Sequence, residues 1–286
     1  MTEACPLCAS PKTRIRYPLT GYNIAECVAC RFEFHEGFTG GGGDDGTFGA
    51  EYYTKIQEKA FEQQFGDYLR DPSAGVYARW LDRIAAHGGK GRLLDVGSAL
   101  GTFLKIAESK GFAPEGVEIS KYASDFAREK RGLTVFNGDL EQFNAKDGSF
   151  DTVTFWDSIE HVTQPLQNLR TARRLLRPGG VLLLTTDNFD CLVADVARAM
   201  YHGSLGTVKY AMERVFIAPN RSYFTEATMR DLLGKTGFRV TKLEKMEYPI
   251  DKIRTNPLEH LVLGAFYGAA HVLNRQAQIT VLATAQ

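Results

Sequence analysis

The sequence carries no excess of charge, because 34 Lys and Arg residues are balanced by 34 Asp and Glu residues over 286 positions. Nucleic-acid phosphates are normally bound by clustered, unbalanced cations, so a nucleic-acid partner is not expected. Long apolar runs are also missing. The longest, residues 258–273, is interrupted by one glutamate and two histidines and is shorter than the about 20 residues of a membrane-spanning helix. The N-terminus lacks the pattern of a signal peptide, so we expect a cytoplasmic protein without a membrane span.

The run 258–273 nevertheless places its apolar residues at helical spacing. Packing against a sheet is the usual outcome for such a helix. A homodimer interface or a lipid-facing surface is the alternative.

Cysteine is nearly absent beyond residue 30, where Cys191 is the only one. The other four form two C-x-x-C pairs, Cys5 with Cys8 and Cys27 with Cys30, separated by eighteen residues. In a cytosolic chain such clustering favours a metal over disulfides, and the spacing is typical of a zinc ribbon with four thiolate ligands. Four thiolates leave no open coordination position, so we expect a structural Zn²⁺ that supplies on the order of 10 kcal/mol to folding.

A glycine-rich stretch, residues 40–46, follows the cysteine pairs and is typical of a linker. We therefore predict a zinc-ribbon module with its linker over residues 1–46 and one larger domain over residues 47–286. The first segment carries four basic against six acidic residues, which is a poor match for a phosphate backbone.

Beyond residue 91, short apolar segments alternate with helical ones. Strands are expected near residues 93–97, 115–119, 134–136, 151–156, 181–186, 238–244 and 278–284. This alternation predicts an α/β fold with a doubly wound parallel sheet covered by helices on both faces. Residues 187–221 show no clear pattern and are interpreted as an irregular insertion over the carboxyl ends of the strands.

The first of these strands ends in the run Asp-Val-Gly-Ser-Ala-Leu-Gly at residues 95–101. Glycines allow a ligand to approach the backbone closely, and the N-terminus of the following helix favours negative groups. Glu118 ends the next strand, where a carboxylate can accept hydrogen bonds from ribose hydroxyls. A dinucleotide dehydrogenase would need glycine at positions 99 and 102, where the sequence has Ala99 and Thr102. The pattern fits acidic-x-G-x-G-x-G with Ala99 in place of the middle glycine.

Three further runs stand at matching places: Gly-Asp-Leu at 138–140, Phe-Trp-Asp-Ser-Ile-Glu-His-Val at 155–162, and Leu-Arg-Pro-Gly-Gly at 176–180. With them, residues 90–245 resemble class I S-adenosylmethionine-dependent methyltransferases, whose sheet is Rossmann-like and seven-stranded. The N-terminal cysteine pairs and the tyrosines at 52–53 are similar to bacterial members that modify sugars or natural products. Arg31 stands where such zinc modules usually place glycine, and the long C-terminal domain of sugar C-methyltransferases is missing.

The resemblance implies S-adenosylmethionine as cofactor and a set of residues that line its site, with Tyr53 as a cover. These residues are Tyr53, Asp95, Gly97, Ala99, Gly101, Glu118, Ile119, Asp139, Leu140 and Asp157.

His161 is the leading candidate for a catalytic base, because it follows the fourth strand, near the place where the methyl group should lie. The alternative is that His161 only orients a loop. His202 in the insertion is a second candidate base, and Asp157 is expected to support the cofactor or the substrate.

The function we expect is methyl transfer to a small molecule, such as a hydroxyl of a sugar, a glycosylated compound or another secondary metabolite in natural-product or polysaccharide biosynthesis. Two alternatives remain open. Zinc modules also accompany RNA methyltransferases, although the acidic balance of residues 1–46 speaks against RNA. The second alternative is a catalytically silent binding subunit that retains the fold, which Ala99 in place of the middle glycine supports.

Overall fold

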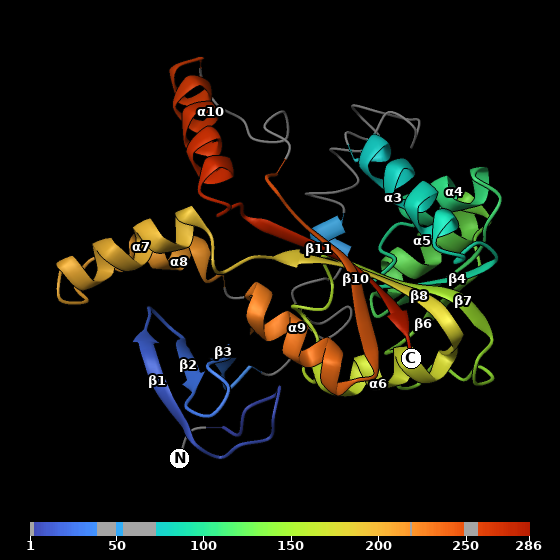
Figure 1. Ribbon diagram of the computed structural model, residues 1–286, viewed down its shortest axis with the longest axis horizontal. Helices are drawn as coiled ribbons and strands as arrows, with labels where there is room; N and C mark the ends of the chain where they lie inside the picture. Colours follow the sequence, from blue (N-terminus) through green and yellow to red (C-terminus); the bar gives the residue numbers. More distant parts are fainter. Residues whose placement is uncertain (1–2, 39–49, 54–72, 218, 249–256) are drawn as a thin grey trace.

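The computed structural model describes residues 3–38, 50–53, 73–217, 219–248 and 257–286. Two β-sheets organise these residues (Figure 1). The larger sheet has seven strands in the order β10-β11-β8-β7-β4-β5-β6. They are β4 (Arg92–Val96), β5 (Ala113–Glu118), β6 (Val135–Asn137), β7 (Phe150–Trp156), β8 (Leu176–Asp187), β10 (Phe238–Met246) and β11 (Gln278–Ala285). All seven strands expected from the sequence are present, and the predicted α/β fold is confirmed.

One strand departs from the predicted parallel arrangement. Strands β6, β5, β4, β7 and β8 pair in parallel, whereas β11 is antiparallel to both β8 and β10. The chain returns from β10 to β11 through α10 (Pro257–Val272), which stands beyond one end of the sheet in Figure 1. Because this connection does not cross the sheet, β11 has to run in the reverse direction.

Helices cover both faces of the large sheet. Successive side chains of a strand point to opposite faces, so neighbouring residues enter different layers of the core. Leu93 packs in a layer with α3 (Ala74–Ala86), α4 (Thr102–Ser109) and α5 (Lys121–Arg131). Leu94 packs on the other face with α6 (Pro165–Leu175) and α9 (Glu226–Lys235). The doubly wound arrangement follows from this alternation.

Two helix starts expected from the sequence are capped as the residue types predict. The Ser120 hydroxyl accepts a hydrogen bond from the Ala123 N–H at the start of α5. The Thr225 hydroxyl accepts from the Thr228 N–H at the start of α9, and the Thr228 hydroxyl accepts from the Thr225 N–H in return.

The small sheet joins the N-terminal segment to the rest of the chain. Strands β1 (Thr13–Pro18), β2 (Asn23–Cys27) and β3 (Glu33–Glu36) pair antiparallel, and β9 (Ser222–Tyr223) adds a fourth strand to β3. Phe32 and Phe224 lie 5.2 Å apart between ring centroids within the core that also contains α6 and α9. The N-terminal strands therefore share both a sheet and a core with residues far along the chain. The boundary that we predict at residues 46 and 47 lies outside the described residues.

The expectation that residues 187–221 are irregular is wrong, whereas their place as an insertion stays a prediction. The segment contains α7 (Leu192–Gly203) and α8 (Tyr210–Val215), which lie beside the β1–β2–β3 sheet (Figure 1). Their buried side chains form one cluster with the N-terminal strands, including Tyr17, Ile24 and Phe216. The helices were hard to see in the sequence because much of the surface that buries them comes from β1 and β2, 165 or more residues away along the chain.

Helix α10 does not pack against the sheet, which corrects the expectation for the run 258–273. Among its described side chains, Leu261 is 70% and Val272 is 84% exposed, while Ala270 is buried. None of the described helices combines the length and the apolar character that crossing a membrane requires.

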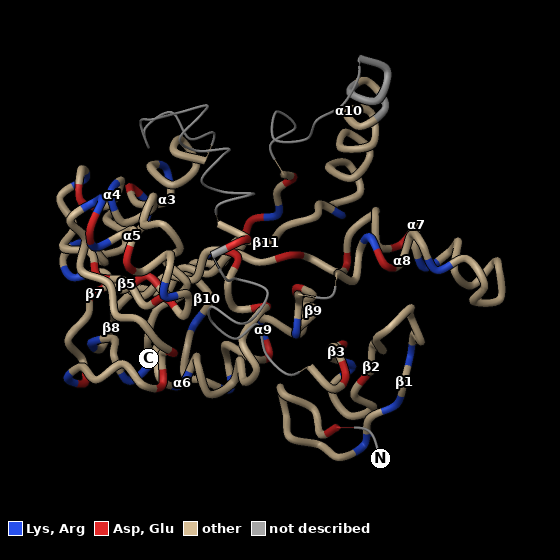
Figure 2. The backbone as a smooth tube through the Cα atoms, turned by 180° about the vertical axis from the view of Figure 1, so that it is seen from behind, with Lys and Arg blue, Asp and Glu red and all other residues tan. Residues whose placement is uncertain are grey.

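Charges of both signs are interspersed along the described chain (Figure 2). On the small sheet, the basic residues of β1 face acidic residues of β2 and β3. Arg14 and Arg16 pair with Glu26, at 2.7 and 3.1 Å, and Arg16 also pairs with Glu33 at 2.8 Å. Much of the module's positive charge is therefore neutralised by its own carboxylates.

We expect Phe32→Ala to lower the free energy of unfolding by about 3 kcal/mol or more, because it empties a fully buried position in the shared core. Both tryptophans, Trp80 and Trp156, lie outside the N-terminal strands, so their fluorescence during urea unfolding reports on the large sheet. Val28→Ala is the matched control, because Val28 is 51% exposed and its loss should cost less than about 0.5 kcal/mol. An unchanged fluorescence midpoint for Phe32→Ala would show that the module folds independently.

Candidate active site

The loop between β4 and α4 forms a tight turn with three residues in the left-handed region. Gly97, Ala99 and Gly101 have φ values of 79°, 48° and 81°. A Cβ atom at Gly97 would lie 2.6 Å from the Ser158 Cβ, and one at Gly101 would lie 2.4 Å from a Leu133 methyl group. Both glycines are therefore required by space as well as by conformation. Ala99 adopts the same backbone conformation at a cost that glycine would not carry.

Glu118 holds this turn against β5. Its side chain is 3% exposed. One carboxylate oxygen accepts the Ala99 N–H at 2.7 Å, and the other accepts the Ser120 N–H at 2.9 Å. Burial raises the pKa of Glu118, while these two N–H donors act in the opposite direction. The Ile119 N–H acts on the Glu118 carboxylate in the same direction. Because an ionised carboxylate has about four acceptor positions, it keeps capacity for a further donor, which fits a ribose hydroxyl.

Asp95 lies beneath the turn and is 2% exposed. It accepts the Thr154 hydroxyl at 2.6 Å. Burial and the charge of Glu118 raise the pKa of Asp95 to about 7, and the Thr154 hydrogen bond lowers it in part. The structure thus brings Asp95 and Glu118 together at the carboxyl ends of β4 and β5, as the sequence predicted.

Tyr53 lies over the place where Glu118 holds the turn at residues 97–101, which we call the Glu118 corner. It is 4% exposed, and its ring stacks on that of Tyr122 with centroids 6.3 Å apart. Leu100 and Ala123 complete the cluster. Burial and the charge of Glu118 raise the pKa of Tyr53. Its position agrees with a cover for the Glu118 corner.

Three more of the predicted cofactor residues, Ile119, Asp139 and Leu140, lie at the adjoining edge. Asp139 is exposed and follows β6, whereas the Leu140 side chain is buried in the core below it. The Asn137 amide donates to the carbonyl oxygens of Glu118 and Ile119 at 3.0 and 3.1 Å. Sequence reasoning missed Asn137, which ties the ends of β5 and β6 together.

On the other side of β4, carboxylates gather at the ends of β7 and β8. Asp157 is exposed and has a φ of 47°. Glu160 is 3% exposed and accepts the Thr186 hydroxyl at 3.0 Å. Burial, with Asp157 and Asp187 nearby, raises the pKa of Glu160. Asp187 accepts the Asn220 amide at 3.1 Å and the Tyr248 hydroxyl. Sequence reasoning did not single out Glu160, Asp187 or Tyr248 for this side of the site.

His161 belongs to the same group. Its Nδ1 lies 3.1 Å from the Pro219 carbonyl oxygen, which fixes the tautomer with the proton on Nδ1 and the lone pair on Nε2. Burial lowers the pKa of His161, so its neutral form is favoured at pH 7. His202, the second candidate base, lies on α7 with its ring 6.0 Å from that of Tyr17 on β1. Helix α7 extends away from the large sheet (Figure 1), so His202 is not brought to this group.

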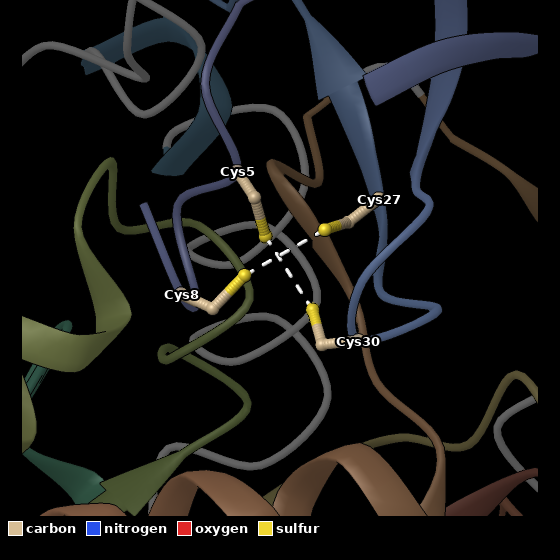
Figure 3. A group of neighbouring side chains, drawn as sticks. All are labelled: Cys5, Cys8, Cys27 and Cys30. Atoms are coloured by element: carbon tan, nitrogen blue, oxygen red, sulfur yellow. Dashed lines mark hydrogen bonds between the residues drawn. The ribbon is translucent and has the colours of Figure 1, made fainter. Parts of the chain in front are cut away.

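The four N-terminal cysteines converge (Figure 3). The Sγ atoms of Cys5 and Cys30 lie 3.7 Å apart, those of Cys8 and Cys27 lie 3.6 Å apart, and all four lie within 4.8 Å of one another. Sulfur atoms bound tetrahedrally at about 2.3 Å from one Zn²⁺ lie about 3.8 Å from each other. The cluster therefore has the dimensions of a four-thiolate zinc site.

The two cysteine pairs share a backbone feature. Ala9 and Arg31 each follow the second cysteine of a pair, and their φ values are 57° and 63°. Arg31 thus takes the left-handed conformation for which glycine is the usual residue. Its guanidinium pairs with Glu26 at 3.0 Å, which anchors the side chain on β2.

Comparison with known proteins shows which family the chain resembles. Residues 68–243 match the model of a family described as a methyltransferase domain. The chain is 28% identical over 187 residues to a ubiquinone biosynthesis O-methyltransferase of Pseudomonas aeruginosa, over 60% of this chain and 79% of the relative. A protein of the same name from Thiobacillus denitrificans is 29% identical, over 61% and 76% of the two chains. A solved structure of a SAM dependent methyltransferase from Archaeoglobus fulgidus has the same fold, with a TM-score of 0.54 at 20% identity over 81% of this chain and 99% of that chain.

For the cysteine cluster, we expect Cys30→Ser to weaken zinc binding about tenfold or more, because it removes one of four thiolates. The measurement is competition with a chromophoric chelator on the full chain, with metal content checked by mass spectrometry. Cys191→Ser should keep the wild-type affinity, because Cys191 lies outside the cluster. A wild-type chain that takes up no zinc would contradict the assignment.

Proposed function

The chain belongs to the methyltransferase domain family, and from this premise we propose that it transfers the methyl group of S-adenosylmethionine to a hydroxyl of a small molecule. That it is an S-adenosylmethionine-dependent methyltransferase follows from the family. The proposal concerns the acceptor and the residues. As acceptors we propose a sugar, a glycosylated compound or another secondary metabolite.

The observation that carries the proposal is the corner at Glu118. The carboxylate fixes the glycine turn through the Ala99 N–H and retains acceptor capacity for a ribose, while Tyr53 lies over it. Asp139 and Ile119 stand at the adjoining edge, where an adenine would lie. We propose that these residues, with Asp95, Gly97, Gly101 and Leu140, hold the nucleoside.

When bound, S-adenosylmethionine supplies a methyl group on a positively charged sulfur, which needs no covalent help from the protein. The residues of the chain have to orient the acceptor, and orientation alone can contribute several kcal/mol. We assign the acceptor side to the group at the ends of β7 and β8, because Asp157, Glu160, His161 and Asp187 gather there.

A hydroxyl acceptor has to lose a proton, and we propose His161 as the base that takes it at Nε2. The Pro219 carbonyl oxygen holds the proton on Nδ1, and the lowered pKa keeps the ring neutral. Hydroxyl methylation is further supported by the relatives, which are named as O-methyltransferases.

A structural zinc in the four-cysteine cluster completes the proposal. The cluster has no ligand position left for a substrate, so we assign it to folding and not to methyl transfer.

We expect Glu118→Gln to weaken S-adenosylmethionine binding about tenfold or more, because the amide replaces one acceptor oxygen of the Glu118 corner with a donor. Isothermal titration calorimetry measures the dissociation constant. Glu115→Gln on the same strand is the control, because Glu115 pairs with Arg92 away from the turn. Binding of NAD in place of S-adenosylmethionine by the wild-type chain would defeat the proposal.

Replacing the base is expected to separate chemistry from cofactor binding. With radiolabelled S-adenosylmethionine and caffeate or UDP-glucose as probe acceptors, His161→Gln should lower kcat about 100-fold or more. The dissociation constant for S-adenosylmethionine should stay close to that of the wild type. His202→Gln on α7 is the matched control and should keep wild-type turnover.

The pH dependence of kcat/KM is a second test of His161 as the base. Because burial lowers the pKa of His161, the acidic limb of kcat/KM should lie below the ordinary histidine value of about 6.5. Activity should rise with pH as the ring loses its proton. If His161→Gln retains both kcat and this limb, His161 is not the base.

A further inference from the structure

A short segment, residues 219–223, lies between the four-cysteine module and the acceptor side of the site, and we call it the strap. Four of its residues contact the acceptor side. The Pro219 carbonyl oxygen lies 3.1 Å from His161 Nδ1, and the Asn220 amide donates to Asp187 at 3.1 Å. The N–H groups of Arg221 and Ser222 both donate to the Glu160 carbonyl oxygen, at 2.8 and 3.0 Å.

The opposite edge of the strap is bound by the N-terminal module. Tyr223 and Ser222 pair with β3, and the Arg221 carbonyl oxygen accepts the His35 N–H at 2.9 Å. The Arg221 guanidinium donates to the His35 carbonyl oxygen and to the Glu3 carboxylate. It also lies 5.3 Å from the centroid of the Phe34 ring. Arg221 therefore contacts both the module and the Glu160 loop.

Arg221 is an unusual residue for a purely structural position. Its side chain is 3% exposed, while its carboxylate partner Glu3 is 41% exposed. Its Nε is buried and has no hydrogen-bond partner among the described residues. Burying a guanidinium with incomplete pairing lowers stability, and an apolar residue would often serve better. A buried arginine at this position is explained if its contacts fix how the strap lies between the module and the Glu160 loop.

The cysteine cluster is connected to Arg221 through β3. Cys27 and Cys30 flank the turn that leads into β3, and the Cys27 N–H donates to the Phe32 carbonyl oxygen at 2.9 Å. From Phe32 the chain enters β3, which pairs with the strap. The cysteines are thus connected through β3 to residues that contact Glu160 and His161.

We propose that Arg221 is a positioning residue, which clamps the strap between the module and the Glu160–His161 loop, and that the metal-loaded module sets the acceptor side through it. The proposal rests on the proposed function only in assigning that loop to the acceptor side.

Hydrogen exchange on the full-length, zinc-loaded chain tests the proposal without any acceptor. In Arg221→Gln, peptides covering residues 156–164 and 219–224 should exchange about tenfold faster or more, while β4 and β5 keep their protection. Arg221→Lys should restore part of the protection, because an ammonium can still donate to Glu3 and to the His35 carbonyl oxygen. Calorimetry should give wild-type affinity for S-adenosylmethionine, because Glu118 is held by its own hydrogen bonds.

Arg198→Gln is the matched control. Arg198 also joins the module to the rest of the chain, through Glu33 at 3.1 Å and the Phe189 carbonyl oxygen at 2.8 Å, but on α7. Its loss should leave the 156–164 peptide protected. If Arg198→Gln exposes that peptide as much as Arg221→Gln does, general docking of the module holds the loop and the role of Arg221 is overturned.

Two further arms keep the test decisive. If Arg221→Gln does not fold, Glu3→Gln removes one partner from an exposed position and should raise exchange in the same two peptides. Removing zinc from the wild-type chain with a chelator should do so as well. Unchanged exchange after zinc removal would overturn the role of the module. Failure of the methyltransferase assays would leave these results unaffected, so the two proposals fail separately.

Discussion

The contact on which the site depends is the pair of hydrogen bonds that Glu118 accepts from Ala99 and Ser120. The first bond fixes the turn that ends β4, and the second fixes the start of α5, so one carboxylate aligns two crossovers of the sheet. The Glu118 carboxylate is buried, which raises its pKa, and only backbone N–H donors act in the opposite direction. Asp95 and Tyr53, whose pKa values are raised in part by the charge of Glu118, lie around it. The corner is therefore assembled around a charge that the protein itself only partly neutralises, which leaves it suited to a ligand that donates hydrogen bonds.

Both halves of the site retain features that lower stability. Ala99 and Asp157 occupy left-handed backbone conformations that non-glycine residues adopt at a cost of about 1 kcal/mol or more each. Glu160 is buried next to two other carboxylates, and its raised pKa reflects that environment. Such costs persist only where the surrounding structure fixes them, and here the fixing elements are the parallel strands β5, β4, β7 and β8. Strain and buried acids coincide with the carboxyl ends of these strands, where ligands of doubly wound sheets bind.

The sequence contained the parts of the site that are local in the chain. Glycines at 97 and 101, the acid at 118 and the two cysteine pairs are recognisable because a turn, a strand end or a metal knuckle needs those residue types at fixed spacing. The strap was not recognisable, since a two-residue strand has no periodicity and its partner His35 is 186 positions from Arg221. Helices α7 and α8 were missed for a related reason, because the surface that buries them comes from the N-terminal strands. The exposed face of α10 was only the alternative to packing in the sequence, since its apolar spacing is also that of a packed helix.

The shared sheet also gives the proposed zinc site a role next to this site. A segment as small as β1 to β3 has little core of its own, and a zinc bound at its four cysteines would supply on the order of 10 kcal/mol to folding. Because β9 completes the sheet of β1 to β3, that free energy would order the strap as well as the module. The strap in turn donates two N–H groups to one carbonyl oxygen, that of Glu160, next to His161. The hydrogen bonds to the Glu160 carbonyl oxygen and to the His161 ring therefore come from the strap, outside the large sheet. Under our proposals, the folding energy of a metal site and the placement of the acceptor side both depend on one four-stranded sheet.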